Sequence, residues 1–331
     1  MKNYDFVAIG DIVTDAFIRL SDATVTSDPS GENSMLSVRF GDKVPYDSVE
    51  IIRAVGNSAN AAVSASRLGI SSALVANIGN DQNGKECLES LKKSGVKDDF
   101  IKTHAGKETN YHYVLWYKDD RTILVKHQDY EYELPDLGNP KWIYLSSLAQ
   151  NTQAYHKQIA EYVKKHPETK LAFQPGTFQM KLGIEELKDI YKHTEIFFCN
   201  VEEARRILNT KGNETVEELL ADVAKLGPKI VVITDGSKGA YVFDGTDTWF
   251  MPTYPDPKPP FERTGAGDAF ASTFTCALVL GMSIPQALMW GPINSMSVVQ
   301  YVGAQKGLLS RSQLEEYLQN APAEYKPRLL S

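Results

Sequence analysis

The 331-residue chain has a formal net charge of −7, and 42% of its residues are hydrophobic while 23% are charged. This composition is typical of a globular protein, and its acidity argues against a surface that binds nucleic acid or an anionic membrane. The N-terminus lacks a basic region followed by an apolar run and a cleavage site. No apolar stretch approaches the ~20 residues of a membrane-spanning helix, so we expect a cytoplasmic protein.

The cysteines are few and widely separated. Cys87, Cys199 and Cys276 form no Cys-x-x-Cys pair and show no Cys/His spacing typical of a metal site. Neither a structural zinc site nor a disulfide framework is therefore expected. We interpret all three as small, buried, hydrophobic side chains.

Apolar runs of strand length recur along the chain, and most are continuous rather than alternating, as in strands covered on both faces. These runs are Phe6–Ile9, Ala73–Ile78, Trp142–Leu145, Leu171–Phe173, Ile196–Cys199 and Ile230–Ile233. Helical patterns lie between them, at Ser58–Leu68, Lys85–Ser94, Glu202–Leu208 and Thr215–Leu226. The alternation predicts one α/β domain over residues 1–331, with a doubly wound, mostly parallel sheet and helices on both faces.

Two regions break this alternation. Thr24–Ile52 is polar, contains several turn residues and has no helical period. Asn110–Tyr132 alternates, with Asp119-Asp120 as a turn, which predicts a β-hairpin. We interpret both as one small antiparallel sheet, built from about residues 16–52 and 108–132, that projects from the core as a lid. The same surface could form a homodimer interface, and the two roles are compatible.

The C-terminal part is predicted to be helical. One helix spans Asp268–Leu280 and ends near Gly281. The next helix is capped by Ser283, carries Pro285 in its first turn and runs toward Val302.

A glycine-rich stretch after one predicted strand has most of the spacing of a phosphate-binding loop. Gly79–Glu86 matches that spacing through Lys85, but Glu86 stands where the motif needs a Ser or Thr hydroxyl for Mg²⁺. We interpret the stretch as a strand-to-helix turn. No G-x-G-x-x-G follows the first strand, so a dinucleotide-binding fold is also disfavoured.

The predicted helix start at Gly265-Ala266-Gly267-Asp268 combines two glycines with a carboxylate. Glycines let a ligand approach the backbone, and amides at a helix N-terminus can hold developing negative charge. A carboxylate beside such an anion hole is poorly suited to hold an anion, but it can accept the proton of an attacking hydroxyl. Asp268 would then be a general base. The alternative is an ordinary helix cap.

Other polar residues follow predicted strands. Asn200 and Glu203 lie three apart at a helix start, where they could orient a hydrated Mg²⁺ or simply cap the helix. Thr234–Gly239 is a glycine-rich turn after a strand, and ligands collect at the carboxyl ends of strands in open α/β sheets. The remaining candidates lie near the first strand and first helix: Asp11, Asp15, Gly56, Asn57 and Asn60.

Taken together, these segments resemble the ribokinase-like (PfkB) carbohydrate kinase family, and the likeness covers nearly the whole chain in order. Its most specific part is Thr264–Asp268, supported by the Asn200/Glu203 pair and by Thr234-Asp-Gly236. The resemblance implies ATP- and Mg²⁺-dependent phosphorylation of a hydroxyl, usually a primary one, on a small sugar or nucleoside such as ribose or adenosine.

The resemblance also implies roles for the matching residues. Asp268 corresponds to the catalytic base, and Gly265, Ala266 and Gly267 correspond to the anion hole. On the nucleotide side the matching residues are Asn200, Glu203 (holding Mg²⁺ through water), Thr234, Gly236, Gly239 and Asn294. On the acceptor side they are Asp15, Gly56, Asn57 and Asn60.

Some positions depart from the family pattern. Val55-Gly56 stands where two glycines are common, and Glu262-Arg263 where many members carry Asp-Thr or Asp-Pro. Glu262 could still contribute to a loop that binds a monovalent cation such as K⁺. We expect Arg263 to reach a nucleotide phosphate.

The acceptor stays open. Aromatic residues of the predicted hairpin, such as Tyr111 and Trp116, suit stacking against a nucleobase or sugar, or ordinary sheet packing. Ribose, fructose, 2-keto-3-deoxygluconate and a nucleoside are all compatible, and we favour a neutral pentose or nucleoside. A non-catalytic sugar or nucleotide sensor on the same fold would typically lose the base or the metal pair, and this chain retains both. No Ser-His-Asp order or metal cluster supports a hydrolase.

Overall fold

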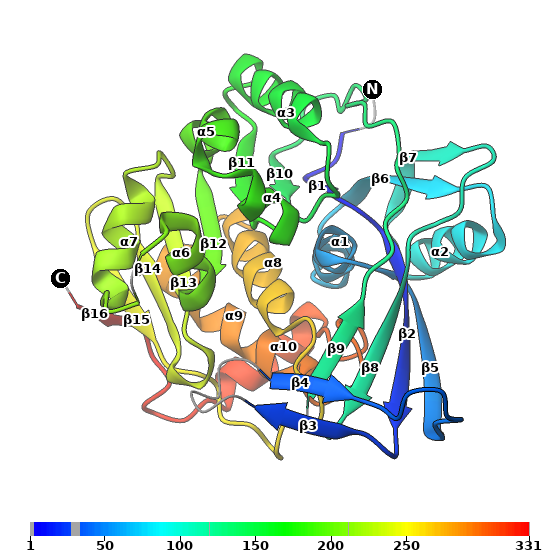
Figure 1. Ribbon diagram of the computed structural model, residues 1–331. Coiled ribbons are helices and arrows are strands. Elements are labelled where there is room, and N and C mark those ends of the chain that lie inside the picture. Colours follow the sequence, from blue (N-terminus) through cyan, green and yellow to red (C-terminus); the bar gives the residue numbers. More distant parts are fainter. Residues whose placement is uncertain (1–2, 28–33, 119, 211, 331) are drawn as a thin grey trace.

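The computed structural model describes residues 3–27, 34–118, 120–210 and 212–330. Within this part of the chain, the centre is a ten-stranded sheet in the order β16-β15-β14-β13-β12-β11-β10-β1-β6-β7 (Figure 1). From β7 at one edge of this order to β13, each strand is parallel to its neighbour. The three remaining strands, β14, β15 and β16, each pair with their neighbours in the antiparallel direction. The strands are β1 (Phe6–Ile9), β6 (Ser72–Gly79), β7 (Lys97–His104), β10 (Trp142–Leu145), β11 (Lys170–Phe173), β12 (Ile196–Asn200), β13 (Ile230–Thr234), β14 (Ala240–Phe243), β15 (Thr248–Met251) and β16 (Arg328–Leu329).

Helices cover both faces of this sheet, as predicted for a doubly wound fold (Figure 1). One face packs against α1 (Asn57–Arg67), α2 (Gln82–Lys93), α8 (Ala266–Val279), α9 (Ile284–Val298) and α10 (Arg311–Gln319). The other packs against α3 (Gln153–Lys165), α5 (Ile184–His193), α6 (Val201–Leu208) and α7 (Val216–Ala224), and the short α4 (Thr177–Leu182) precedes α5. The sequence of β1 is continuously apolar because its side chains alternate between two cores. Phe6 and Ala8 enter one core, while Val7 and Ile9 enter the other.

All six predicted strands are confirmed as members of this sheet, and the predicted helices are confirmed with ends shifted by one to a few residues. The stretch Gly79–Glu86 is a strand-to-helix turn, in which Asp81 caps α2 by accepting a hydrogen bond from the Gly84 N–H at 2.8 Å. The three cysteines are buried and free. No described helix is both long and apolar enough to cross a membrane.

A second, four-stranded sheet, here called the small sheet, projects from the core (Figure 1). Its described strands run in the order β5 (Tyr46–Val55), β2 (Val13–Leu20), β8 (Tyr111–Tyr117) and β9 (Asp120–Leu124). The predicted small antiparallel sheet is confirmed in its β5–β2 and β8–β9 pairings, whereas the pairing of β2 with β8, which joins them, is parallel. Both strands follow parallel strands of the central sheet, β1 and β7, and leave it in the same direction.

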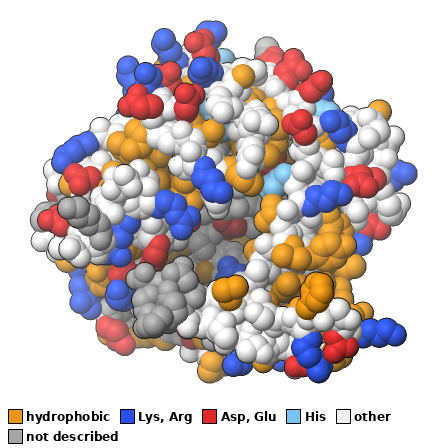
Figure 2. Space-filling view, viewed as in Figure 1, with side chains coloured by type: hydrophobic (Ala, Val, Ile, Leu, Met, Phe, Trp, Pro, Cys, Tyr) orange, Lys and Arg blue, Asp and Glu red, His pale blue; other side chains and the backbone are white. Residues whose placement is uncertain are grey.

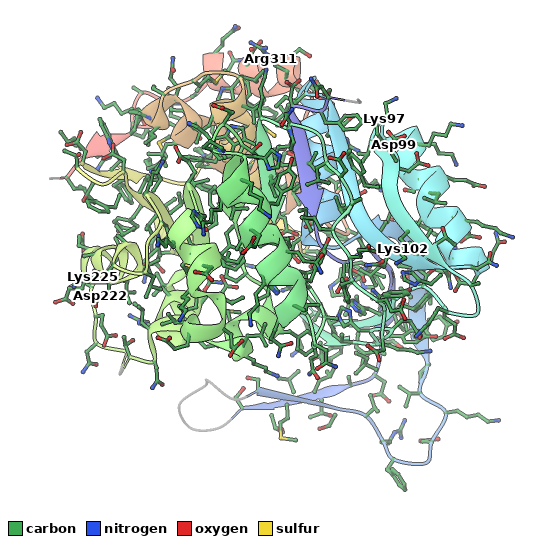
Figure 3. The ribbon with its side chains drawn as sticks, turned by 90° about the horizontal axis from the view of Figure 1, so that it is seen from above. Lys97, Asp99, Lys102, Asp222, Lys225 and Arg311 are labelled. Carbon is green, nitrogen blue, oxygen red and sulfur yellow. The ribbon has the colours of Figure 1, made fainter. Side chains whose placement is uncertain are left out.

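The predicted region 16–52 is also not one continuous part of the small sheet. Strands β3 (Thr24–Ser27) and β4 (Ser34–Ser37) form a separate two-stranded ribbon, which Figure 3 shows standing away from the α/β body. Residues 28–33 lie outside the described residues, as does Asp119 of the predicted turn, while Asp120 begins β9.

The inner face of the small sheet packs onto the core near its C-terminal segments. Phe17, Val114 and Trp116 form a cluster with Val302, and Ile52 packs against it. A Cβ added at Gly303 would collide with the Ile52 side chain, so this glycine allows the close approach of strand β5. The small sheet therefore rests on the loop that follows α9.

Candidate active site

A hollow lies at one edge of the central sheet, between the core and the small sheet (Figure 2). The carboxyl ends of parallel strands meet at this edge. Asn200 and Thr234 end β12 and β13, Gln174 follows β11, and all three line the hollow together with Asp268 at the start of α8. The fold thus brings together residues that lie far apart in the sequence.

Helix α8 begins with its N-terminus at this hollow. Gly265 is the N-cap with φ +81°, and no side chain caps the helix. A Cβ at Gly265 would lie 2.6 Å from Ala304 Cα, so this position needs glycine for its conformation and for close packing. The first N–H groups of a helix have no partner inside the helix, so those at Ala266 and Gly267 can hold an anion.

Asp268 is buried and is held by three amide groups. Its Oδ1 accepts hydrogen bonds from Asn57 Nδ2 at 2.9 Å and from Gln174 Nε2 at 3.1 Å, and its Oδ2 accepts one from Asn60 Nδ2 at 2.8 Å. Tyr144 donates to Gln174 Oε1, which turns the Gln174 amide group toward Asp268. Asn57 and Asn60, which the resemblance assigns to the acceptor, are thus used here to orient the carboxylate.

Burial raises the pKa of Asp268 above that of an ordinary aspartate, and the hydrogen bonds from Asn60, Gln174 and Asn57 oppose this rise. A raised pKa means that the carboxyl group takes up a proton at a higher pH than an exposed aspartate would. A base must be unprotonated to act, so activity that depends on Asp268 falls as the pH drops through this raised pKa.

Asn57→Ala is expected to move the acidic limb of the kcat–pH profile to higher pH. The Asn57 hydrogen bond lowers the pKa of Asp268, so its removal lets burial raise that pKa further. Steady-state rates measured from roughly pH 4 to pH 9, a range chosen to cover carboxyl titration, test for this shift of the acidic limb. Asn80→Ala, at an exposed asparagine after β6, is the control. An unshifted limb in Asn57→Ala would contradict the assignment.

Asn200 and Glu203 form a reciprocal cap at the start of α6. The Glu203 N–H donates to Asn200 Oδ1 at 2.8 Å, and the Asn200 N–H donates to Glu203 Oε2 at 2.9 Å. Both side chains also line the hollow, and burial raises the pKa of Glu203. The helix-cap interpretation is therefore confirmed, and the cap leaves both side chains at the wall of the hollow.

A second pocket adjoins the hollow and shares Thr234, Arg263, Gly267 and Phe270 with it. Gly236 and Gly239 line this pocket, and both have positive φ. Arg263 lines both pockets, so its guanidinium lies between the two halves of one continuous trough.

Asn294 does not line either pocket. Its side chain is fully buried: Nδ2 donates to Thr273 Oγ1 at 2.7 Å and Oδ1 accepts from the Leu309 N–H at 2.9 Å. It ties α8 and the segment before α10 to α9, and its neighbours Ser295 and Met296 line the second pocket instead. Asn294 itself is therefore not placed at the pocket, whereas its two neighbours are.

Gly56 precedes Asn57, which lines the hollow, and lies against Asp11, one of the two aspartates that follow β1. Gly56 has φ +112°, and a Cβ there would lie 2.6 Å from the Asp11 carbonyl oxygen. Asp11 and Asp15 are both buried. Sequence reasoning missed the side chains that face these aspartates from the small sheet, His112 and His127, because nothing in their spacing sets them apart from the other histidines.

The small sheet also touches the segment just before the anion hole. Arg121 of β9 lies 3.7 Å from Glu262, measured from Nε to Oε1, and it lines the hollow. The Trp116 and Phe261 rings meet edge to face, with their centroids 5.2 Å apart. Glu262 is buried and accepts from the Thr264 N–H at 2.6 Å and the Gly303 N–H at 3.3 Å.

Among the described residues, no group of three or more His, Cys, Asp or Glu side chains is placed to hold a metal ion directly. Glu203 nevertheless fits Mg²⁺, which commonly keeps several waters and binds through one or two carboxylates and substrate phosphates. Glu262 fits a monovalent cation less well, because both of its oxygens already accept protein N–H groups.

Residues 51–311 match the model of the pfkB family carbohydrate kinases. The chain is 27% identical to the ATP-dependent 6-phosphofructokinase of Thermoanaerobacterium thermosaccharolyticum, over 92% of this chain and 90% of that protein. It is 29% identical to the ribokinase of Bacillus subtilis, over 90% of this chain and 96% of that protein. A ribokinase of Arabidopsis thaliana, solved with ribose and ATP, has the same fold, with a TM-score of 0.80 and 21% identity over 96% of this chain and 99% of that one.

Proposed function

We propose that this chain, which belongs to the pfkB family of carbohydrate kinases, transfers the γ-phosphoryl group of ATP to a hydroxyl, in our proposal a primary one, of a neutral sugar or nucleoside. The observation that carries this proposal is the buried carboxylate of Asp268, held by three amides beside the uncapped start of α8. A base and an anion site within one residue of each other suit the attack of a hydroxyl on a phosphoryl group.

In the proposed reaction, the acceptor oxygen forms a bond to the γ-phosphorus, and the bond from that phosphorus to the bridging oxygen of ADP breaks. Asp268 takes the proton of the acceptor hydroxyl. The N–H groups of Ala266 and Gly267 hold the charge of the transferring group. Arg263 and the trough lined by Thr234, Gly236 and Gly239 hold the nucleotide. Mg²⁺, oriented through water by Glu203 and Asn200, neutralises phosphate charge when bound.

We propose that the small sheet acts as a lid, because Arg121 and Trp116 contact the Glu262 segment directly before the anion hole. A closed lid keeps water away from the phosphoryl group. Arg121→Ala is therefore expected to raise acceptor-independent ATP hydrolysis several-fold relative to transfer. ADP formation with and without acceptor measures this ratio, and Arg39→Ala, at an exposed arginine just after β4, is the control. Equal ratios in wild type and Arg121→Ala would refute a lid role for this contact.

We also propose that the outer face of the small sheet forms a homodimer. Ile51, Tyr113 and Leu124 lie on that face in connected register positions, and each is about half exposed. Figure 2 shows hydrophobic side chains gathered over these strands. Leu124→Glu should shift the protein from dimer to monomer in analytical ultracentrifugation, whereas Leu330→Glu, at an exposed C-terminal leucine, should not. A wild-type monomer at all concentrations would contradict the proposal.

The experiment that tests the proposed function is an acceptor panel. ADP release is measured with neutral sugars (ribose, fructose), nucleosides (adenosine), a sugar acid (2-keto-3-deoxygluconate) and a sugar phosphate (fructose 6-phosphate). We expect strong stimulation by at least one neutral acceptor. ATP binding without turnover on any acceptor would favour the alternative, a non-catalytic sensor on the same fold.

A further inference from the structure

We propose that His112 and His127, paired with Asp15 and Asp11, read two hydroxyl groups of a neutral polyol acceptor and so determine its specificity. This inference rests on the proposed function, because it names the class of acceptor used by the same site. Of these four residues the resemblance assigns only Asp15 to the acceptor, whereas the roles of Asp11 and the two histidines follow from the structure.

Asp15 and His112 belong to the small sheet, while Asp11 lies in the segment before β2 and His127 lies after β9. His112 lies directly opposite Asp15 in the parallel pairing of β8 with β2, and His112 Nδ1 is 3.3 Å from Asp15 Oδ1. His127 Nδ1, beyond the end of β9, is 3.5 Å from Asp11 Oδ2. The two imidazole rings meet edge to face with their centroids 5.3 Å apart, so the two pairs form one cluster.

Both pairs leave polar atoms without hydrogen bonds. Within the described structure, Asp11 Oδ2, Asp15 Oδ1, His112 Nε2 and His127 Nδ1 are buried and form no hydrogen bond, although Asp11 Oδ2 faces His127 Nδ1 at 3.5 Å and Asp15 Oδ1 faces His112 Nδ1 at 3.3 Å. Asp11 and Asp15 are only 7% and 9% exposed. Buried polar groups are nearly always hydrogen-bonded, and a carboxylate oxygen without a partner costs free energy. The cluster therefore has the character of a binding site that a ligand completes.

The orientation of Asp11 supports this reading. Tyr132 donates its hydroxyl to Asp11 Oδ1 at 2.7 Å, which fixes the carboxylate and leaves Oδ2 as the oxygen to be satisfied. His127 is itself packed edge to face against Phe178, with centroids 5.5 Å apart. Neighbouring residues therefore hold Asp11 and His127, which carry two of the atoms without hydrogen bonds, in place.

The cluster adjoins the transfer site. Asp11 packs through its carbonyl oxygen against Gly56, and the next residue, Asn57, donates to Asp268 at 2.9 Å. A small molecule bound to the cluster would therefore lie next to the carboxylate that takes the proton. None of the four side chains lines the hollow or the second pocket, and the link to Asp268 runs through Gly56 and Asn57.

The chemistry of the four groups selects the ligand. A hydroxyl can donate to a carboxylate oxygen and accept from an imidazole N–H, so each Asp–His pair suits one hydroxyl. Two carboxylates in a buried site repel an acceptor that carries a carboxylate or phosphate of its own. Among the described residues no cluster suitable for a metal ion is present, so these side chains are not explained as metal ligands. A neutral sugar, or the ribose of a nucleoside, fits best.

The test measures binding of ribose, fructose and adenosine by isothermal titration calorimetry without ATP. His112→Phe and His127→Phe, which keep a ring but lose its nitrogens, should each weaken binding of the preferred acceptor about 10- to 100-fold. The matching Gln variants, which keep an N–H donor, should recover part of this loss. His193→Gln, at the end of α5, should bind as wild type does. ATP affinity should be unchanged in all variants.

A second set of binding measurements uses only the wild-type protein, so it tests the inference even where a variant fails to fold. 2-Deoxyribose and 2′- or 3′-deoxyadenosine should bind about 10-fold or more weakly than their parents, and gluconate and fructose 6-phosphate should not compete. Parent-like binding of every deoxy analogue, unchanged binding by both Phe variants, or preference for an anionic acceptor would each overturn the inference. Loss of phosphorylation with these binding effects intact would instead count against the proposed function.

Discussion

Asp268→Asn is expected to lower kcat by about 10²- to 10⁴-fold, the range contributed by a positioned general base. The substitution keeps the size of the side chain but removes its ability to take the acceptor proton. The remaining oxygen can still accept from Asn57 and Gln174, whereas the new amide nitrogen would face the donor Nδ2 of Asn60. Asn60 cannot turn over freely, because its Oδ1 accepts from Gln305 Nε2 at 3.0 Å.

This clash makes a stability control necessary. Thermal unfolding of Asp268→Asn should show a modest loss, and the affinity for ATP should stay close to that of the wild type. Single-turnover rates with the best acceptor of the panel then report the chemical step alone. A rate within about 3-fold of the wild-type rate would be far below the contribution of a general base and would remove Asp268 from that role.

Gly267→Ala and Gly265→Ala should have opposite signatures. A Cβ at Gly267 meets no atom closer than Gln174 Nε2 at 3.9 Å, so the protein can fold with it. That Cβ would nevertheless project from a glycine that lines both pockets, beside the transfer site. We expect Gly267→Ala to keep its melting temperature and to lose about 10²-fold or more in kcat, as after the loss of an anion-hole contact.

Gly265→Ala should instead destabilise the fold. Its φ of +81° costs a residue with a Cβ about 1–2 kcal/mol, and the added carbon would also press on the backbone of Ala304. Denaturant unfolding and single-turnover rates of the two variants separate the effects. Normal stability in Gly265→Ala together with normal activity in Gly267→Ala would contradict the geometry of the anion hole.

The sequence predicted those parts of the fold that depend on local pattern. The parallel strands were visible because β1 is apolar along its whole length and β6 contains the apolar run Ala73–Ala76. Strand β7, Lys97–His104, was not predicted, because it lies at the edge of the sheet and its sequence is charged. The parallel pairing of β2 with β8 was not predicted, since no local pattern records which strands of the core they follow.

In the candidate site, too, only the features that depend on local pattern could be predicted from the sequence. The turn at Gly265–Asp268 could be interpreted from its sequence, because glycines beside a carboxylate at a helix start have few explanations. The contacts of Asn57 and Asn60 with Asp268 cross more than 200 residues of chain, and only the folded arrangement of α1 beside α8 creates them. His112, His127 and Arg121 are isolated in the sequence. Only the folded structure shows their contacts with Asp15, Asp11 and Glu262.

The central claim is that this protein moves a phosphoryl group from ATP to a hydroxyl through Asp268. Its most direct test is mass spectrometry of the products formed by wild type and Asp268→Asn from ATP and the best neutral acceptor. The account predicts one phosphorylated acceptor for each ADP released by the wild type, and almost no phosphorylated acceptor from the variant. ADP release without a phosphorylated acceptor, or equal product from both proteins, would contradict it.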